Sequence, residues 1–270
     1  MTLSIIDNNL AYYRLSIIDL LKGRAFMGIN LTNYDALTFD VYGTLIDWEP
    51  TIISLFHSTA DQYGVKLSDE QLLLEFDKAR AELQRRRPAL LYTDVLRNAY
   101  AQFCETYHIP QNAKEREVYA NAVMLWPTFD DTKESLAYLQ RHFKIGLLSN
   151  IDDESILFSE RKLGIKADVV VTAQQVGAYK PDHAHFGAAF KAFKNLGIPK
   201  QRILHVGQSL RADVIPANQL GIPSVWITRP GRSLGSRPED AVGAKPDLTL
   251  HSLHELALYH QAHASISEAS

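Results

Sequence analysis

Asp40 is the first residue whose type and position suggest chemistry. It directly follows residues 36–39, an apolar run that predicts a short buried strand, and Gly43 and Thr44 supply a turn just after it. A carboxylate in that position lies at the carboxyl edge of a sheet, where open α/β folds bind their ligands. Asp40 can cap the turn, or it can act as a nucleophile whose covalent ester is later cleaved by water. The local sequence leaves both interpretations open.

Two further strand ends carry polar side chains. Ser149 and Asn150 follow the apolar residues 145–148. They either cap the next helix, or the Ser149 hydroxyl holds a substrate anion or the nucleophile. Lys180 follows a strand and a short loop in the stretch VGAYKPD. A lone lysine is usually solvated, but an ammonium group within about 4 Å keeps a partly buried carboxylate ionised.

The stretch HVGQSLRAD supplies the fourth group. It places Gln208, Ser209 and Asp213 after the strand expected at residues 202–206. Asp213 suits two roles that can coexist, because it can cap the following helix and can orient or deprotonate a water molecule. Four separate strand ends therefore carry polar groups that could act together.

These stretches resemble the motifs of a known superfamily. DVYGTLIDWE, LLSNID, YKP and QSL-x-x-D-x-x-PA are similar to the four motifs of haloacid dehalogenases. The similarity is greatest to the metal-independent type II branch, the (S)-2-haloacid dehalogenases, and close to them azetidine-2-carboxylate hydrolase, and it covers residues 34–263. It implies that Asp40 is the nucleophile and that Lys180 pairs with it.

Two positions differ from the magnesium-dependent phosphatases of that superfamily. Those enzymes carry an acidic proton donor where this chain has Tyr42, and a metal-binding Asp where it has Gln208. A phenol with a pKa of about 10 is a poor acid for expelling an alkoxide, and magnesium prefers an octahedral set of hard oxygens. We therefore expect no metal and no cofactor, and a leaving group that needs no proton, such as halide or a protonated ring amine.

The predicted cap offers one candidate contact for the leaving group. Type II dehalogenases carry a cap arginine that faces the halide, and Arg86 falls six residues before Tyr92, as the family's spacing suggests. Arg86 lies in a run of three arginines, however, and such a run is also typical of a solvated helix end. We keep Arg86 as a candidate substrate contact, with both interpretations open.

The pattern of apolar residues predicts an α/β fold in two parts. Helical periodicity predicts a four-helix cap domain over residues 50–126, with helices near 52–64, 69–87, 90–107 and 115–125. From residue 130 helices alternate with strands, which indicates right-handed crossovers and a parallel sheet. Residues 34–49 and 127–270 would form this Rossmann-like core.

Residues 1–33 precede the core as an extension. Charged residues interrupt the helical pattern of its first part, which makes it a poor signal peptide. Met27 lies seven residues before Tyr34, so one possibility is that translation begins at Met27. Otherwise we expect an appended helix that packs on the core or on a partner subunit.

Composition narrows the possible partners. The chain has 270 residues, 46% of them hydrophobic, which is enough for a full core. A formal charge of −3 gives no electrostatic case for nucleic acid or an anionic membrane, and no apolar run reaches the roughly 18 residues of a membrane span. Cys104 is the single cysteine, which fits a reducing cytosol. We expect a cytoplasmic protein, with a homodimer left open.

The sequence therefore predicts a hydrolase that displaces the C2 substituent of a small 2-substituted carboxylic acid through an aspartyl ester. Asp40 would attack, Lys180 and Ser149 would hold Asp40 and the substrate carboxylate, and Asp213 would position the water. The remaining expected pocket residues are Tyr42, Thr44, Asn150, Gln208, Ser209 and Arg86. Two alternatives remain, a magnesium-dependent phosphatase that uses the same Asp40 and a non-catalytic binding protein of the same fold.

Overall fold

The computed structural model describes residues 28–232, 234 and 241–268. In this part of the chain, parallel strands form one sheet in the order β3-β2-β1-β4-β5-β6. The strands are β1 (Ala36–Phe39), β2 (Lys144–Ser149), β3 (Val169–Thr172), β4 (Ile203–Gly207), β5 (Ser224–Ile227) and β6 (Leu248–Leu250). The strand order reverses at β1, and the carboxyl ends of strands at such a switch point are where open α/β sheets bind ligands. The predicted α/β fold is confirmed.

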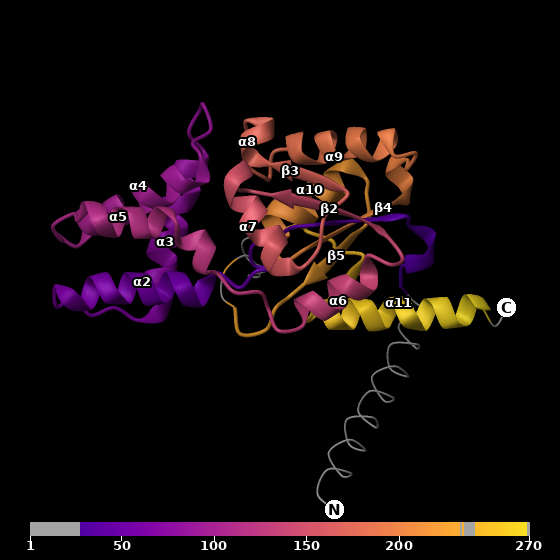
Figure 1. Cartoon of the computed structure of the whole chain (residues 1–270), viewed down its shortest axis with the longest axis horizontal. Helices are drawn as coiled ribbons and strands as arrows, with labels where there is room; N and C mark the ends of the chain where they lie inside the picture. Colours follow the sequence, from indigo (N-terminus) through magenta and orange to yellow (C-terminus); the bar gives the residue numbers. More distant parts are fainter. Residues whose placement is uncertain (1–27, 233, 235–240, 269–270) are drawn as a thin grey trace, which may run out of the picture.

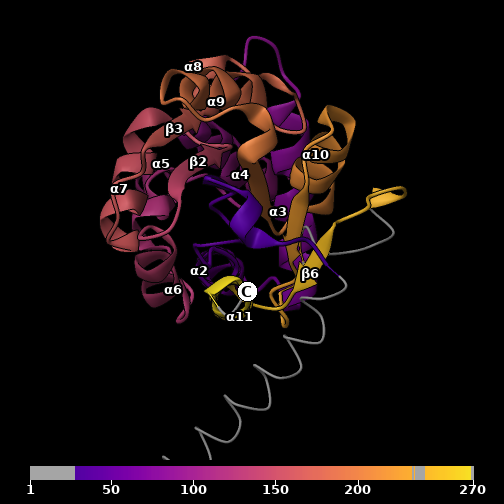
Figure 2. The same ribbon diagram turned by 90° about the vertical axis from the view of Figure 1, so that its right-hand side faces the viewer.

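Helices cover both faces of the sheet (Figures 1 and 2). On one face, α9 (Ala184–Asn195) and α10 (Ile215–Leu220) pack against side chains such as Leu148 and Val171. The other face contacts α6 (Thr132–Leu139), α7 (Asp153–Leu163) and α11 (Leu253–Glu268). Because both faces of the sheet are buried, the strands consist of nearly continuous runs of apolar residues.

A short segment precedes the sheet. The 3₁₀ turn η1 (Leu31–Asn33) packs against α11, and the Tyr259 hydroxyl donates a hydrogen bond to the carbonyl oxygen of Ile29 at 3.2 Å. Residues 28–33 of the expected extension thus pack on the core, whereas residues 1–27 lie outside the described part of the chain. Among the described helices, none is both long and apolar enough to cross a bilayer.

The predicted helical insertion lies between β1 and β2 and forms a group beside the core (Figure 1). Its helices are α2 (Glu49–Gln62), α3 (Asp69–Gln84), α4 (Tyr92–Thr106) and α5 (Ala113–Ala120). Ser68 and Gln71 form a reciprocal capping box that starts α3. The fourth predicted helix is shorter than expected, because a 3₁₀ turn, η2 (Ala122–Leu125), follows α5.

The two connections between cap and core run side by side. The Asp47 amide donates a hydrogen bond to the carbonyl oxygen of Pro127 at 2.8 Å. The fully buried Trp126 lies at this junction, and its ring centroid is 5.1 Å from that of Tyr42 and 6.3 Å from that of Trp48. Aromatic packing therefore fixes the base of the cap against the loop that follows β1.

The packing of β2 against α9 predicts the effect of one substitution. A Cβ atom at Gly146 would lie 2.9 Å from Phe193 Cε2 and 3.1 Å from Thr38 Cγ2. Gly146→Ala should lower the free energy of unfolding by about 1–3 kcal/mol, measured by urea denaturation. The control is Gly187→Ala in α9, where a Cβ meets open space; this change should be neutral or stabilising by up to about 1 kcal/mol. Equal stability of Gly146→Ala and wild type would contradict the packing described.

Candidate active site

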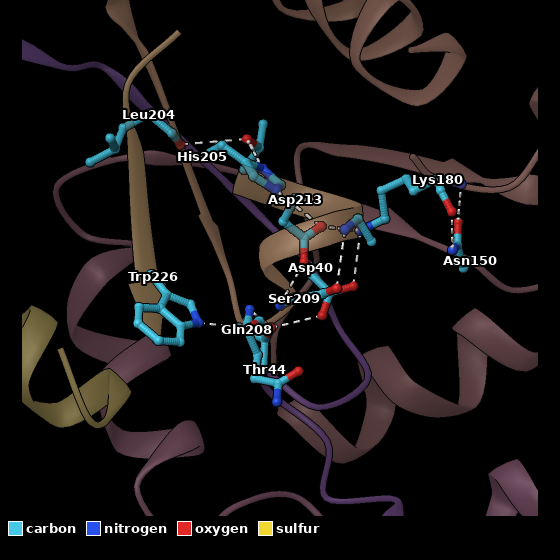
Figure 3. Close-up of polar contacts among 12 residues, drawn as sticks. Asp40, Thr44, Asn150, Lys180, Leu204, His205, Gln208, Ser209, Asp213 and Trp226 are labelled. Atoms are coloured by element: carbon cyan, nitrogen blue, oxygen red, sulfur yellow. Dashed lines mark hydrogen bonds and ion pairs between the residues drawn. The ribbon is translucent and has the colours of Figure 1, made fainter. Parts of the chain in front are cut away.

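The site forms where three neighbouring strands end (Figure 3). Phe39 of β1 pairs in register with Leu147 of β2 and Val206 of β4. Asp40, Asn150 and Gln208 each follow one of these strands within a few residues, so their side chains emerge at the same edge of the sheet. The structure therefore brings together polar groups that lie far apart in the sequence.

Lys180 lies at the centre of this group. Its Nζ donates hydrogen bonds to Asp40 Oδ1 at 2.9 Å and to Asp213 Oδ1 at 2.7 Å. The side chains of Lys180 and Asp40 are only 1% and 11% exposed, and that of Asp213 is fully buried. One ammonium group thus lies between two buried carboxylates, which leaves the three groups with a single net negative charge.

Asn150 holds the main chain of this lysine. Its Oδ1 accepts from the Lys180 amide at 2.6 Å, and its Nδ2 donates to the Lys180 carbonyl oxygen at 3.1 Å. Asn150 also lines the cavity beside Asp40. Because both polar atoms of its side-chain amide are engaged, Asn150 positions Lys180. Its place in the cavity wall is compatible with the expected substrate contact, which stays a prediction.

Thr44 completes the shell around Asp40. Its hydroxyl donates to Asp40 Oδ2 at 2.7 Å and accepts from the Gln208 amide at 2.8 Å. Burial raises the pKa of Asp40 above its ordinary value, while Lys180 and Thr44 oppose this rise by stabilising the carboxylate. Each oxygen of Asp40 therefore has a defined donor, and the carboxylate is held in one orientation.

Asp213 is held more deeply than Asp40. Its Oδ1 contacts Lys180 and, at 3.3 Å, His205 Nε2, and its Oδ2 accepts from the Ser209 amide at 3.1 Å. Burial alone would raise its pKa, but the Lys180 ammonium and the His205 hydrogen bond outweigh burial and lower the pKa of Asp213 to about 2. Asp213 does not line the cavity. Its geometry suits a residue that positions Lys180, and the expectation that it orients or deprotonates a water molecule stays a prediction.

The helix-capping role expected for Asp213 belongs to Ser209. The Ser209 hydroxyl accepts from the Ala212 amide at 3.1 Å and starts the helical turn η4 (Leu210–Val214), which places Asp213 inside the turn. Gly207 permits this arrangement, because a Cβ atom there would lie 2.6 Å from Asp213 Oδ2. The glycine in HVGQS thus allows the carboxylate to pack against the end of β4.

A small cavity of about 70 Å³ lies above Asp40, between core and cap. This volume is several times the roughly 10–15 Å³ that a cavity needs in order to hold one water molecule, so the cavity accommodates a reacting group of few heavy atoms. Its walls come from both parts of the chain: Asp40, Tyr42, Trp48, Arg80, Gln84, Tyr92, Asn150, Lys180, Gln208, Ser209, Arg211, Ala212 and Leu234.

Tyr42 occupies the sequence position of the phosphatase proton donor, but its contacts do not suit a proton donor. Its hydroxyl forms a 2.7 Å hydrogen bond with Ser159 Oγ, and its ring packs edge-on against Trp126. Burial raises the pKa of Tyr42 well above its ordinary value of about 10. At neutral pH the group therefore stays a phenol that gives up its proton reluctantly.

The residues at the expected metal position do not fit a magnesium ion. Gln208 uses its side-chain Nε2 to donate to the Leu234 carbonyl oxygen, and its main-chain oxygen accepts from Trp226 Nε1 at 2.9 Å. Asp40 and Asp213 both accept from Lys180, whose positive charge occupies the space between them. Across the described ranges, no cluster of three or more His, Cys, Asp or Glu side chains is placed to bind a metal.

Three residues predicted to contact the nucleophile or the substrate, Ser149, Thr44 and Arg86, do not line the cavity. The Ser149 hydroxyl is buried with no hydrogen-bond partner in the described structure, and its carbonyl oxygen accepts from His185 Nε2 at 3.1 Å. Arg86 lies beyond the end of α3, where it pairs with Glu82 at 3.3 Å with about half of its side chain exposed. The interpretation of Arg86 as a solvated helix end fits this placement, and its expected contact with the substrate stays a prediction.

Arg80 is the cap arginine that faces the cavity. It pairs with Asp77, and its guanidinium carbon lies 5.5 Å from the Trp48 ring centroid. Its Nε is buried with no hydrogen-bond partner among the described residues. A signal for this placement exists in the sequence, because Phe76, Arg80 and Leu83 follow the i, i+4, i+7 spacing of one helix face.

Comparison with known proteins agrees with this architecture. A family model for haloacid dehalogenase-like hydrolases matches residues 34–221. The chain is 30% identical over 156 residues to a phosphoserine phosphatase of Thermus thermophilus, an alignment that covers 55% of this chain and 58% of that protein, less than two thirds of its length. It is 27% identical over 212 residues to the 5-amino-6-(5-phospho-D-ribitylamino)uracil phosphatase YigB of Escherichia coli, covering 73% and 84% of the two chains.

Solved structures show the same fold. The crystal structure of the L-2-haloacid dehalogenase PA0810 superposes with a TM-score of 0.68 at 21% identity, over 88% of this chain and all of that one. At this level of identity the likeness concerns the fold. The matched family model covers most of the chain and includes all four segments that contribute to the site, at Asp40, Asn150, Lys180 and Gln208. The protein therefore belongs to the haloacid dehalogenase-like hydrolases.

Proposed function

We propose that this hydrolase displaces the C2 substituent of a small 2-substituted carboxylic acid through an ester on Asp40, without a metal ion. The observation that carries the proposal is the position of Lys180 between Asp40 and Asp213. The ammonium group supplies, next to the nucleophile, positive charge of the kind that a divalent ion supplies in a phosphatase. The fold is shared with a solved L-2-haloacid dehalogenase and so permits this reaction.

The first step uses groups that line the cavity. An Asp40 oxygen attacks C2 from the side opposite the leaving group, the C2–X bond breaks with its electron pair on X, and C2 is inverted. Two of the three N–H donors of Lys180 are engaged by carboxylates. The third donor, with Arg80, can hold the substrate carboxylate. Halide needs no proton, so this step does not require Tyr42 to act as an acid.

The second step releases the product. Water adds to the carbonyl carbon of the Asp40 ester, the ester C–O bond breaks, and the 2-hydroxy acid, one proton and the Asp40 carboxylate are formed. Gln208 and Ser209 line the cavity beside Asp40 and can orient this water. The cap limits the entry of bulk water, which strengthens the polar contacts inside. The same attack opens azetidine-2-carboxylate, whose protonated ring nitrogen replaces halide.

A magnesium-dependent phosphatase is the second candidate, favoured by the names of the two relatives found by sequence. Asp40 would then attack phosphorus, and the leaving alkoxide would need a proton. Tyr42 and Gln208 argue against it, because neither offers the carboxylate that those steps require. Hydrolysis of p-nitrophenyl phosphate that depends on magnesium and is lost with chelator would establish this candidate.

The covalent step is tested at Asp40. Asp40→Asn should lower kcat for 2-chloropropionate by at least about four orders of magnitude, because an amide is a poor nucleophile. In a single turnover of wild type in ¹⁸O-labelled water, the label should appear in Asp40 and be absent from the product. Label in the product of the first turnover would contradict an ester intermediate.

The polar shell of Asp40 predicts a pH dependence. Burial raises the pKa of Asp40, so kcat/KM should fall on acidification at a pH above the ordinary range of an aspartate. Thr44 opposes this rise by bonding to the charged form. In Thr44→Val the acid limb should therefore move to higher pH, measured from kcat/KM profiles of the two proteins. An acid limb that stays in place, or moves to lower pH, would contradict the role of Thr44.

The cap arginines offer a matched pair. Arg80→Gln should lower kcat/KM about 10- to 100-fold, because a hydrogen bond to a charged group contributes roughly 1.5–3 kcal/mol. Arg86→Gln, from the same end of α3 but outside the cavity, should behave as wild type. Steady-state kinetics on both variants makes the comparison. A larger loss of kcat/KM in Arg86→Gln than in Arg80→Gln would mean that Arg86, and not Arg80, contacts the substrate.

A further inference from the structure

A second cleft of about 450 Å³ opens beside the catalytic cavity. One wall is the C-terminal end of α3 with Arg85 and Arg87, and the other is the loop 179–182 together with Arg211. Gln84, Lys180 and Arg211 line both this cleft and the catalytic cavity. The two spaces are therefore neighbouring compartments of one cap–core junction.

The cleft carries an excess of positive charge. The side chains of Arg85 and Arg211 have no hydrogen-bond or ion-pair partner among residues 28–232, 234 and 241–268. Arg87 Nη1 donates to the carbonyl oxygens of Gln84 and Arg86. Asp182 is the acidic residue of the lining, and its Oδ1 accepts from the Ala184 amide. Among the described residues, three guanidinium groups and one carboxylate thus line this space, and no ion pair joins Asp182 to any of the three arginines.

An independent observation points to a ligand at the boundary of the two compartments. Gln84 Nε2 is buried and has no hydrogen-bond partner in the described structure, as is also true of Arg80 Nε one helical turn earlier. A buried donor without an acceptor costs free energy. An oxygen-rich group passing from the cavity to the cleft would satisfy both donors.

We propose that the arginine cleft binds a second carboxylate of the substrate, so that the natural substrates are 2-substituted dicarboxylic acids. This inference rests on the proposed function. The first carboxylate and C2 occupy the small cavity above Asp40, and the chain of the substrate passes Gln84 and Arg211 to place its far carboxylate among Arg85, Arg87 and Arg211. Displacement then gives a 2-hydroxy dicarboxylate, halide and one proton. A monocarboxylate would leave this cationic cleft without a counterion.

The test compares acids of equal chain length that end in carboxylate or in methyl. 2-Chloroglutarate and 2-chloroadipate are measured against 2-chloropentanoate and 2-chlorohexanoate. Wild type should prefer the dicarboxylates in kcat/KM by more than about fivefold. Arg85→Gln and Arg87→Gln, which change residues of the cleft that do not line the catalytic cavity, should each lose about fivefold on dicarboxylates alone, as expected for partly exposed ion pairs. Arg86→Gln, which lies outside both compartments, should keep the preference.

Two outcomes would overturn the assignment. One is an equal kcat/KM for both series in wild type. The other is an equal loss for monocarboxylates and dicarboxylates in the variants, because that pattern means that the arginines only steer anions toward the site.

A binding measurement separates failure of this inference from failure of the proposed reaction. Glutarate and adipate, which carry no leaving group, are titrated calorimetrically into wild type, Arg211→Gln and Arg86→Gln beside pentanoate and hexanoate. If diacids bind more tightly than monoacids and only Arg211→Gln loses this difference, the cleft binds the second carboxylate, even if no chloro acid is turned over. If chloro acids are turned over but diacids and monoacids bind equally well, the proposal that the cleft binds a second carboxylate is wrong, whereas the proposed displacement reaction still stands.

Discussion

The buried ion triad of Lys180, Asp40 and Asp213 is the interaction on which the rest of the site depends. Removing charged groups from water is costly, and a buried carboxylate without its partner is strongly destabilising. The surrounding structure accordingly supplies a partner for each group. His205 bonds to Asp213 and is itself held by Thr38 at 2.9 Å, while Asn150 fixes the main chain of Lys180. The candidate active site is therefore a single network whose members set one another's positions.

This network also limits the chemistry. The Lys180 ammonium lies between two carboxylates that would otherwise be the natural ligands of a cation. In the proposed reaction, a carboxylate stabilised in this way can still attack carbon bearing a good leaving group, because that reaction needs no acid and little charge neutralisation. Phosphoryl transfer from an alkyl phosphate needs an acid for the leaving alkoxide and more neutralisation of negative charge. The common fold serves both chemistries, so the side chains at Tyr42 and Gln208 carry more weight for function than the fold itself.

Much of the fold could be predicted from the sequence, because apolar runs and helical periodicity are local signals. The alternation of strands and helices after residue 130, the helical insertion and the polar strand ends all follow from such signals. The partners of individual side chains depend on packing between distant segments. Asp213 points to Lys180 because Gly207 leaves room for it, and Arg80 reaches the cavity because of the rotation of α3 about its axis. Arg86 matched the family spacing and still fell outside, since α3 ends at Gln84.

The central claim is that Asp40 forms a bond to carbon with no divalent ion present. The most direct measurement is to quench the protein with acid during turnover of 2-chloropropionate in excess chelator, and to determine the mass of the peptide that contains Asp40. We predict a peptide heavier by one 1-carboxyethyl group, located on Asp40, together with undiminished product formation. An unmodified Asp40 peptide while product accumulates, or turnover that stops with chelator and returns with magnesium, would contradict it.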